Sequence, residues 1–281
     1  MSESLAAKLR AAERRLASIS DSPRLDAELL LAHSLGCARA QLLGRLRDCC
    51  DAPGFGELLQ RRYEHEPIAY IVGEREFFSL TFNIERPLLV PRPETEHLVE
   101  ACLEHVGDAY ARVLELGSGS GCVAVSLAVH GRQTSVVAGD IALRAVAMTR
   151  RNAERHGVQD RVHCVAADGF SALAAGMGNF DAVVSNPPYV ETGAWETLPA
   201  SIRLYEDPAA LLAGPGGLDV IRRIITEAWP YLRPGGLLAL EIGMGQYRAV
   251  ARLLSQHGYE SVTFRRDLAG VERIALGHKP G

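Results

Sequence analysis

The spacing of apolar residues separates a helical first part of the chain from a longer part in which strands and helices alternate. In the first part, Leu5, Leu9 and Leu16 recur at the helical period, and Pro23 is placed to open a second helix. Shorter helical segments follow before the helical spacing of apolar residues ends. The pattern therefore predicts a small N-terminal helical domain over residues 1–75.

From residue 111 onward, short apolar runs alternate with segments of helical period, for example residues 143–155. This alternation predicts βαβ units, and therefore an α/β fold with a mostly parallel sheet covered by helices on both faces. The last two apolar runs have no helix between them, so we expect them to pair antiparallel at one edge. The expected strands are residues 113–116, 135–138, 162–165, 182–185, 237–242, 259–264 and 273–276.

The connection between the two parts is rich in aromatic residues and proline. Residues 76–84 are aromatic and partly alternating, which is typical of a β-hairpin or an extended linker. Three prolines between residues 87 and 93 then stiffen the chain. We therefore expect a β-hairpin linker over residues 76–90 and a second domain over residues 91–281.

Composition and charge argue against several classes of function. The 281 residues are 47% hydrophobic and 23% charged, as in ordinary globular proteins. The net charge of -4 provides no field that would favour a nucleic acid or an anionic membrane. No apolar run approaches the roughly 18 residues of a membrane span, and no signal peptide is apparent. We expect a cytoplasmic monomer with neither a direct nucleic-acid partner nor a membrane partner.

The six cysteines and nine histidines form no recognisable site in the sequence. No two cysteines have the Cys-x-x-Cys spacing, and a disulfide framework would be unusual in a chain of this length. The histidines lack the paired spacing of metal ligands. We therefore expect reduced thiols and no bound metal.

A glycine-rich loop follows the first strand of the alternating part. The loop, Gly117-Ser118-Gly119-Ser120-Gly121, lies between an apolar run and a segment of helical period. Glycines in this strand–turn–helix context let the backbone approach a ligand closely. The next strand ends at Asp140, whose carboxylate is placed to accept hydrogen bonds from the hydroxyl groups of a ribose. These features predict a ligand that contains a nucleoside.

Two ligands use such a geometry, nicotinamide dinucleotides and S-adenosylmethionine. The dinucleotide fingerprint is Gly-x-Gly-x-x-Gly, whereas this loop is Gly-x-Gly-x-Gly and follows the acidic residue Glu115, which favours S-adenosylmethionine. Asp168, at the end of the third strand, is suited either to contact the adenine amino group or to cap a helix that starts at Gly169. The candidate cofactor-binding residues are Gly117, Ser118, Gly119, Ser120, Gly121, Asp140, Asp168, Gly169, Phe170 and Asn186.

The tetrapeptide Asn186-Pro187-Pro188-Tyr189 follows the apolar run 182–184. Two prolines end a buried strand because proline cannot donate to the ladder of hydrogen bonds. The tetrapeptide therefore stands at the edge where open α/β sheets bind their ligands. It offers a carboxamide, exposed carbonyl groups and an aromatic ring, but no base, nucleophile or metal ligand. Such a set is suited to hold a planar, uncharged nitrogen group in one orientation.

The glycine loop and the tetrapeptide together resemble the class I methyltransferases that modify planar nitrogens. These enzymes act on adenine N6 in DNA, on guanine N2 in ribosomal RNA or on glutamine N5 in proteins. Two further segments resemble the peptide chain release factor glutamine methyltransferases: Val90-Pro91-Arg92-Pro93-Glu94-Thr95-Glu96 and Pro67-Ile68-Ala69-Tyr70-Ile71-Val72-Gly73. The resemblance covers nearly the whole chain and includes residues 25–30, 206–211, 216–219 and 267–273.

The resemblance implies a Rossmann-like, seven-stranded class I methyltransferase sheet, mostly parallel with an antiparallel edge, and an N-terminal helical domain. We expect this domain to recognise the substrate; the alternative is that it is only a scaffold. The resemblance also implies transfer of a methyl group from S-adenosylmethionine to the glutamine of the Gly-Gly-Gln loop of class-1 peptide chain release factors, which supports translation termination. Asn186, Pro187 and Tyr189 would then be catalytic, and Asn186, Pro187, Pro188 and Tyr189 would bind the substrate. The alternatives are an adenine-N6 nucleic-acid methyltransferase and a non-catalytic module that binds a nucleoside or NAD.

One position departs from the family pattern, and three others have two interpretations. The family often has a bulky residue directly after the position of Asp168, where this chain has Gly169 and then Phe170. The sequence therefore does not identify the side chain that covers the adenine ring. Thr95 either contacts the site or belongs to a rigid helix start, as do its neighbours Arg92 and Glu94. Glu241 ends a strand near the same edge of the sheet.

Overall fold

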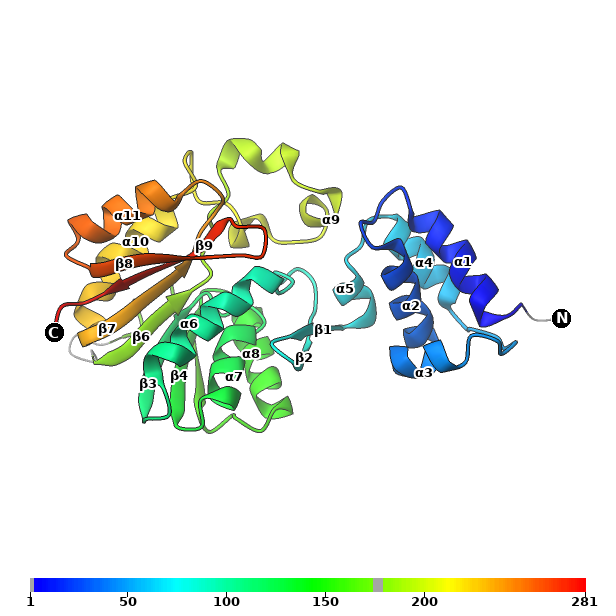
Figure 1. The fold of residues 1–281 in the computed structure, drawn as a ribbon, viewed down its shortest axis with the longest axis horizontal. Coiled ribbons are helices and arrows are strands. Elements are labelled where there is room, and N and C mark those ends of the chain that lie inside the picture. The colour runs from blue at the N-terminus through cyan, green and yellow to red at the C-terminus, as the bar shows by residue number, and fades with distance from the viewer. Residues whose placement is uncertain (1–2, 174–178) are drawn as a thin grey trace. The chain divides into compact units, whose positions relative to one another are not determined.

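The computed structural model describes residues 3–173 and 179–281, and the chain divides into two compact units (Figure 1). The first unit comprises Met1–Glu74 and Leu198–Glu206, and the second comprises Arg75–Thr197 and Asp207–Gly281. The sequence pattern assigned all of residues 91–281 to the second domain. Residues 198–206 instead belong to the first unit, so the chain leaves the second unit and returns to it.

The first unit is built from helices whose leucines share one core. Its main helices are α1 (Leu5–Leu16), α2 (Pro23–Ser34), α3 (Arg39–Gly44), α4 (Phe55–Tyr63) and α5 (Ile68–Val72). Ser4 caps α1, because its side chain accepts a hydrogen bond from the Ala7 N–H. Leu5, Leu9 and Leu16 are fully buried against α2, in agreement with their helical spacing.

A short hairpin opens the second unit. Its strands are β1 (Glu74–Phe77) and β2 (Leu80–Asn83), so it starts earlier and ends earlier than the expected linker over residues 76–90. The Asn83 N–H donates to Oδ1 of Asn152 at 2.8 Å, which ties β2 to helix α8 (Leu143–Arg155).

Seven strands form the central sheet of the second unit in the order β5-β4-β3-β6-β7-β9-β8. The strands from β5 to β7 in this order are parallel, whereas β9 runs antiparallel to both of its neighbours. The predicted fold class and its antiparallel edge are therefore confirmed. The strands are β3 (Ala111–Leu116), β4 (Thr134–Asp140), β5 (Val162–Ala166), β6 (Phe180–Ser185), β7 (Leu232–Glu241), β8 (Glu260–Arg266) and β9 (Glu272–His278).

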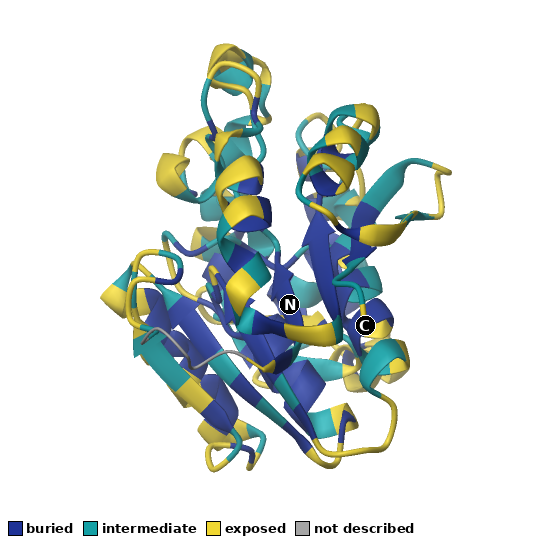
Figure 2. Ribbon diagram, turned by 90° about the vertical axis from the view of Figure 1, so that its left-hand side faces the viewer, coloured by how far each residue is buried: buried dark blue, intermediate teal, exposed yellow. Residues whose placement is uncertain are grey.

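Helices cover both faces of this sheet (Figure 1). On one face α6 (Glu96–Val106) packs on α7 (Cys122–His130), and α7 packs on α8. On the other face α10 (Asp219–Ala228) packs on α11 (Tyr247–Gln256). The central strands are buried and the outward sides of the helices are exposed (Figure 2). Burial on both faces explains why the parallel strands read as continuous apolar runs.

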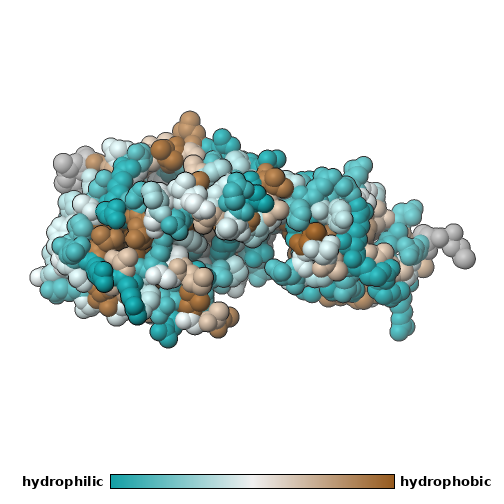
Figure 3. Space-filling model, turned by 90° about the horizontal axis from the view of Figure 1, so that it is seen from above, coloured by the Kyte–Doolittle hydropathy of each residue, from teal (hydrophilic) through white to brown (hydrophobic). Residues whose placement is uncertain are grey.

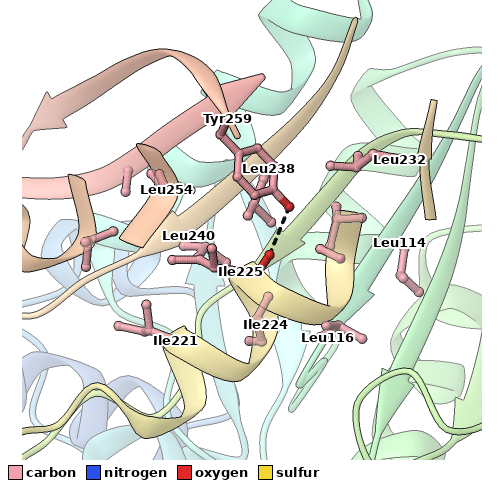
Figure 4. Packing of buried hydrophobic residues seen from close by; sticks show 14 of the residues in the cluster. Leu114, Leu116, Ile221, Ile224, Ile225, Leu232, Leu238, Leu240, Leu254 and Tyr259 are labelled. Carbon is pink, nitrogen blue, oxygen red and sulfur yellow. Dashed lines mark hydrogen bonds between the residues drawn. The ribbon is translucent and has the colours of Figure 1, made fainter. Parts of the chain in front are cut away.

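The core under α10 fixes the strands that lead to the candidate site (Figure 4). Isoleucines on α10 pack beside leucines of β3 and β7 in one buried cluster. The Tyr259 hydroxyl donates to the Ile225 carbonyl oxygen at 3.2 Å, so this buried polar group is satisfied. The cluster includes Leu114, Leu116, Ile221, Ile224, Ile225, Leu238 and Leu240.

The surface carries polar and apolar residues in mixture. On the face seen in Figure 3, small apolar groups are separated by hydrophilic residues. In residues 3–173 and 179–281, no helix combines the length and apolar character needed to span a bilayer.

Candidate active site

A cavity of about 350 Å³ lies at the carboxyl ends of the parallel strands in the second unit. Its size falls in the range of small-molecule sites, roughly 300–1,000 Å³. The four candidate segments follow β5, β4, β3 and β6, which are neighbours in that order, so they meet along one edge. The expected residues that line the cavity are Gly117, Ser118, Gly119, Ser120, Asp140, Asp168, Gly169, Asn186, Pro187 and Pro188.

The glycine loop uses backbone conformations that side chains disfavour. Gly117, Gly119 and Gly121 have φ angles of 74°, 55° and 81°. Gly121 does not line the cavity, because it stands at the start of α7 against α8. A Cβ atom at Gly121 would lie 2.8 Å from the Thr149 Cα. The third glycine of the loop therefore allows helix packing, while the first two border the cavity.

The Asp140 carboxylate is held in a fixed plane at the end of β4. Its Oδ2 accepts the Gly119 N–H and its Oδ1 accepts the Ala142 N–H, both at 2.9 Å. Each oxygen keeps a lone pair for a further donor. The same carboxylate thus joins the glycine loop to β4 and offers two acceptors at the cavity.

Glu115 lies in the buried wall of the cavity. It is 2% exposed, and its Oε2 accepts the Ala124 N–H at 3.0 Å. Burial raises the pKa of this carboxyl group well above its ordinary value, and the nearby Asp140 charge acts in the same direction. A buried carboxyl group whose neutral, protonated form is favoured by its surroundings therefore lies next to the glycine loop.

Arg223 of α10 occupies the end of the cavity near Asp168. Its Nη1 donates to Asp168 Oδ1 at 2.6 Å, and its Nε donates to Glu227 Oε1 at 3.0 Å. A Cβ atom at Gly169 would lie 3.2 Å from Nη2 of Arg223, so the guanidinium fills the space beside this glycine. Residues 169–172 form turns and no helix, so Asp168 is not a helix cap.

Phe170 differs from the expectation that it contacts a cofactor. It is buried in the core under α10, and it is not among the residues that line the cavity. Its ring stacks on Tyr231 with centroids 4.8 Å apart and planes 12° apart. The left-handed turn at Gly169 directs the chain so that this apolar ring packs inside the unit, where its burial is favourable.

The tetrapeptide is held from behind by buried polar groups. Nδ2 of Asn186 donates to Oγ1 of Thr95 at 3.0 Å, and the Thr95 hydroxyl donates to Oε2 of Glu241 at 2.6 Å. The Tyr189 hydroxyl donates to the other carboxylate oxygen at 3.1 Å. Tyr189 does not line the main cavity; it lines a smaller adjoining pocket with Arg92.

Glu241 is one of the most buried charged groups in the described chain, with 1% exposure. Burial raises the pKa of its carboxyl group, while the hydrogen bonds from Thr95 and Tyr189 act in the opposite direction. Burial and the carboxylate of Glu241 also raise the pKa of Tyr189. Tyr189 therefore stays a neutral hydrogen-bond donor at physiological pH.

Comparison with known proteins identifies the family of this chain. Residues 7–73 match the family model described as PrmC N-terminal domain, and residues 94–218 match that described as Methyltransferase small domain. A release factor glutamine methyltransferase of Nitratidesulfovibrio vulgaris is 40% identical over 277 residues, which cover 96% of this chain and 94% of that protein. The chain belongs to the release factor glutamine methyltransferase family. A second such protein, from Bordetella pertussis, is 40% identical over 91% of this chain and 95% of its own length.

Solved structures agree with this family assignment at the level of the fold. A methyltransferase from Pyrococcus furiosus has a TM-score of 0.55 and 20% identity, covering 73% of this chain and 91% of that chain. A Thermus thermophilus 16S rRNA N2 G1207 methyltransferase, solved with AdoMet and guanosine, has a TM-score of 0.53 and 20% identity, covering 73% and 49%. At this identity the likeness concerns the methyltransferase sheet alone.

The sequence of this glutamine methyltransferase family member indicated the glycine loop, the aspartates and the tetrapeptide in the cavity wall, but it gave no sign of Arg223. Arg223 lies among the polar positions of the amphipathic helix α10, where the sequence does not distinguish it from an ordinary exposed arginine. The link from Thr95 to Glu241 was also missed, although each residue had been considered at this edge. Among the described residues, no group of three or more His, Cys, Asp and Glu side chains is arranged to hold a metal.

Proposed function

We propose that this protein acts in the cytoplasm and transfers a methyl group from S-adenosylmethionine to the side-chain amide nitrogen (N5) of the Gly-Gly-Gln glutamine in class-1 peptide chain release factors. One observation carries the proposal: a single cavity is lined both by the glycine loop with Asp140 and by Asn186-Pro187-Pro188. The names of relatives that match nearly the whole chain support this substrate.

The cofactor would lie along the edge from Asp168 to the glycine loop. Asp140 keeps one acceptor site on each oxygen for the two ribose hydroxyl groups. Oδ1 of Asp168 is bonded to Arg223, so Oδ2 is available to accept the adenine amino group. The flat guanidinium of Arg223 would cover adenine where Gly169 has no side chain.

The substrate amide would lie against the tetrapeptide. Asn186 and the Pro187 carbonyl would hold the nitrogen, and Tyr189 would pack nearby and exclude water. S-adenosylmethionine supplies an electrophilic methyl group on a sulfonium. An amide nitrogen is a weak nucleophile, so the contribution of the protein is orientation, which can account for roughly 7–11 kcal/mol of a barrier. The nitrogen gains the methyl carbon, the carbon–sulfur bond breaks toward sulfur, and the nitrogen then loses its proton to water.

The N-terminal helical unit would recognise the protein substrate. A release factor is much larger than the cavity of about 350 Å³, so recognition beyond the glutamine requires a surface outside it. The family model that matches residues 7–73 is separate from the methyltransferase model, as expected of a part with its own role.

One assay tests the proposed function against its alternatives. Labelled S-adenosylmethionine is offered with a release factor, with a release factor whose loop glutamine is replaced, and with duplex DNA. We expect label only in the unaltered release factor. Label in DNA would indicate the adenine-N6 alternative, and no transfer to any of the three would leave a nucleoside-binding module.

A further inference from the structure

A chain of buried hydrogen bonds connects Asn186 to the end of β7. Its members are Asn186 after β6, Thr95 in the short turn before α6, and Glu241 at the end of β7. Thr95 and Glu241 are 2% and 1% exposed. The bond between Thr95 and Glu241 is buried, so water does not compete for it and its direction is set by the two groups themselves.

The direction of the chain follows from counting protons. In the ionised form of Glu241, both carboxylate oxygens accept, one from Tyr189 and the other from Thr95. The single hydroxyl proton of Thr95 is thereby used, so its oxygen can only accept from Asn186. The group of Asn186 that faces Thr95 must then be Nδ2, which agrees with the observed bond at 3.0 Å.

The orientation of Asn186 determines what it offers to a substrate. With Nδ2 held by Thr95, the side-chain carbonyl Oδ1 remains for a donor in the cavity, which Asn186 lines. The backbone carbonyl of Pro187 is a second acceptor at the same place, since proline has no N–H. Two acceptors match the two N–H groups of a primary amide. A reversed Asn186 would present N–H groups to N–H groups.

We propose that Thr95 and Glu241 are positioning residues that fix Asn186 with Oδ1 toward the substrate and thereby limit the reaction to one methylation per glutamine. This inference rests on the proposed function. The N5-methylated product has a single N–H, so it leaves one of the two acceptors unpaired. An unpaired buried acceptor disfavours binding by roughly 5- to 150-fold, so a second transfer is slow.

Three substitutions test the positioning role. Thr95→Val keeps the shape of the side chain but removes the hydroxyl, Thr95→Ser keeps the hydroxyl, and Glu241→Gln replaces an acceptor by a donor. We expect Thr95→Val and Glu241→Gln to lower kcat by about 10-fold or more, the scale for loosening one oriented polar contact. Thr95→Ser should stay within about 3-fold of the wild type, as should the matched control Thr226→Val, an exposed threonine of α10.

Two readouts separate positioning from a structural role. The affinity for S-adenosylmethionine, measured by calorimetry, should be unchanged in Thr95→Val, which also shows that the variant is folded. The rate on a release factor that already carries N5-methylglutamine, relative to the rate on unmodified glutamine, should rise in Thr95→Val and not in Thr95→Ser. Mass spectrometry of the modified peptide measures this ratio.

The outcomes distinguish this inference from the proposed function. If wild-type protein does not methylate a release factor, the proposed function and the inference that rests on it both fail. If the wild type is active and Thr95→Val matches it in kcat and in the ratio of second to first methylation, only the inference fails. If Thr95→Ser is as impaired as Thr95→Val, the hydroxyl is not what positions Asn186, and the inference fails as well.

Discussion

At the scale of single residues, Asn186 is the side chain on which turnover should depend most. It lines the cavity and is held by Thr95. Asn186→Ala should keep the affinity for S-adenosylmethionine, because the proposed ribose and adenine contacts, Asp140 and Asp168, follow other strands. It should lower kcat by about 10²–10³, the scale for one preorganised polar contact. Calorimetry and steady-state methylation measure the two effects, and near-normal methylation would contradict the assignment.

Arg223 should contribute to cofactor affinity. Arg223→Ala removes the side chain beside Gly169 and the partner of Asp168. We expect affinity for S-adenosylmethionine to fall by roughly 5- to 30-fold, the scale of a lost contact between a cation and an aromatic ring. The neighbouring Arg222→Ala is the matched control, because Arg222 pairs with Asp219 and does not line the cavity. Equal affinities of the two variants by calorimetry would count against this role.

Glu115 gives a prediction about pH. Its pKa in the folded protein is raised well above its ordinary value of 4.5, so above about pH 4.5 the folded protein binds more protons than the unfolded chain. The stability contributed by this group therefore falls as pH rises toward the folded pKa. Glu115→Gln cannot ionise and keeps an oxygen for the Ala124 N–H. Urea unfolding without cofactor should show equal stability near pH 4 and an advantage for the variant that grows as pH rises from about 4.5 toward the folded pKa; a pH-independent difference would contradict the assignment.

Single residues also mark the limit of sequence reasoning. Asp140 and Asn186 could be located because each follows an apolar strand, and the carboxyl ends of parallel strands meet. Phe170 could not be located, because its neighbour Gly169 adopts φ 58° and the following residues do not form a helix. Thr95 and Glu241 are 146 residues apart, and no local sequence pattern indicates that their side chains form a hydrogen bond.

At the scale of elements, the contact of α7 with α8 depends on Gly121. Gly121→Ala would place a Cβ atom 2.8 Å from the Thr149 Cα, so the two helices would have to separate. We expect a loss of about 2–4 kcal/mol in the free energy of unfolding, from overpacking and from the left-handed backbone.

Gly117→Ala is the matched control for the packing effect. Gly117 has a similar φ of 74°, but a Cβ atom there meets nothing within 4 Å. Its substitution should cost only the conformational part, about 1 kcal/mol. Urea denaturation of both variants measures the difference, and equal losses would show that the contact with Thr149 does not matter.

The elements themselves were predictable to different degrees. All seven strands were expected, because strands buried on both faces are apolar throughout. Their ends were less certain: β7 begins at Leu232, before the expected start at residue 237, and the Pro234-Gly235-Gly236 sequence within it reads as a turn. The hairpin was expected later in the chain than β1 and β2 lie, because β1 begins at the charged residues Glu74 and Arg75, before the first aromatic residue of the hairpin, Phe77.

At the scale of the whole molecule, the proposed division of labour predicts different effects on large and small substrates. Leu25 and Leu43 of the helical unit are 40% and 38% exposed. The double substitution Leu25→Ser and Leu43→Ser should raise KM for an intact release factor by roughly 3- to 10-fold, the scale of about 1 kcal/mol at an interface. It should not change KM for a short peptide that contains Gly-Gly-Gln.

Tyr110→Ser is the control for this experiment. Tyr110 is 66% exposed and precedes β3 at its amino end, away from the cavity at the carboxyl ends. Its substitution should leave both KM values near those of the wild type. Steady-state kinetics with the two substrates measure the effect, and an equal rise for intact protein and peptide in the double variant would reject a recognition role of these leucines.

The return of residues 198–206 to the first unit has a practical consequence for dissecting the protein. The chain crosses between the units three times, after residues 74, 197 and 206. A fragment that starts at residue 75 would therefore still carry a stretch whose packing partners had been removed. That stretch begins at Leu198, shortly after Tyr189, so truncation would disturb the segment that follows the tetrapeptide as well as removing the helical unit. Point substitutions, and not excised domains, are therefore the appropriate way to determine the function of each unit.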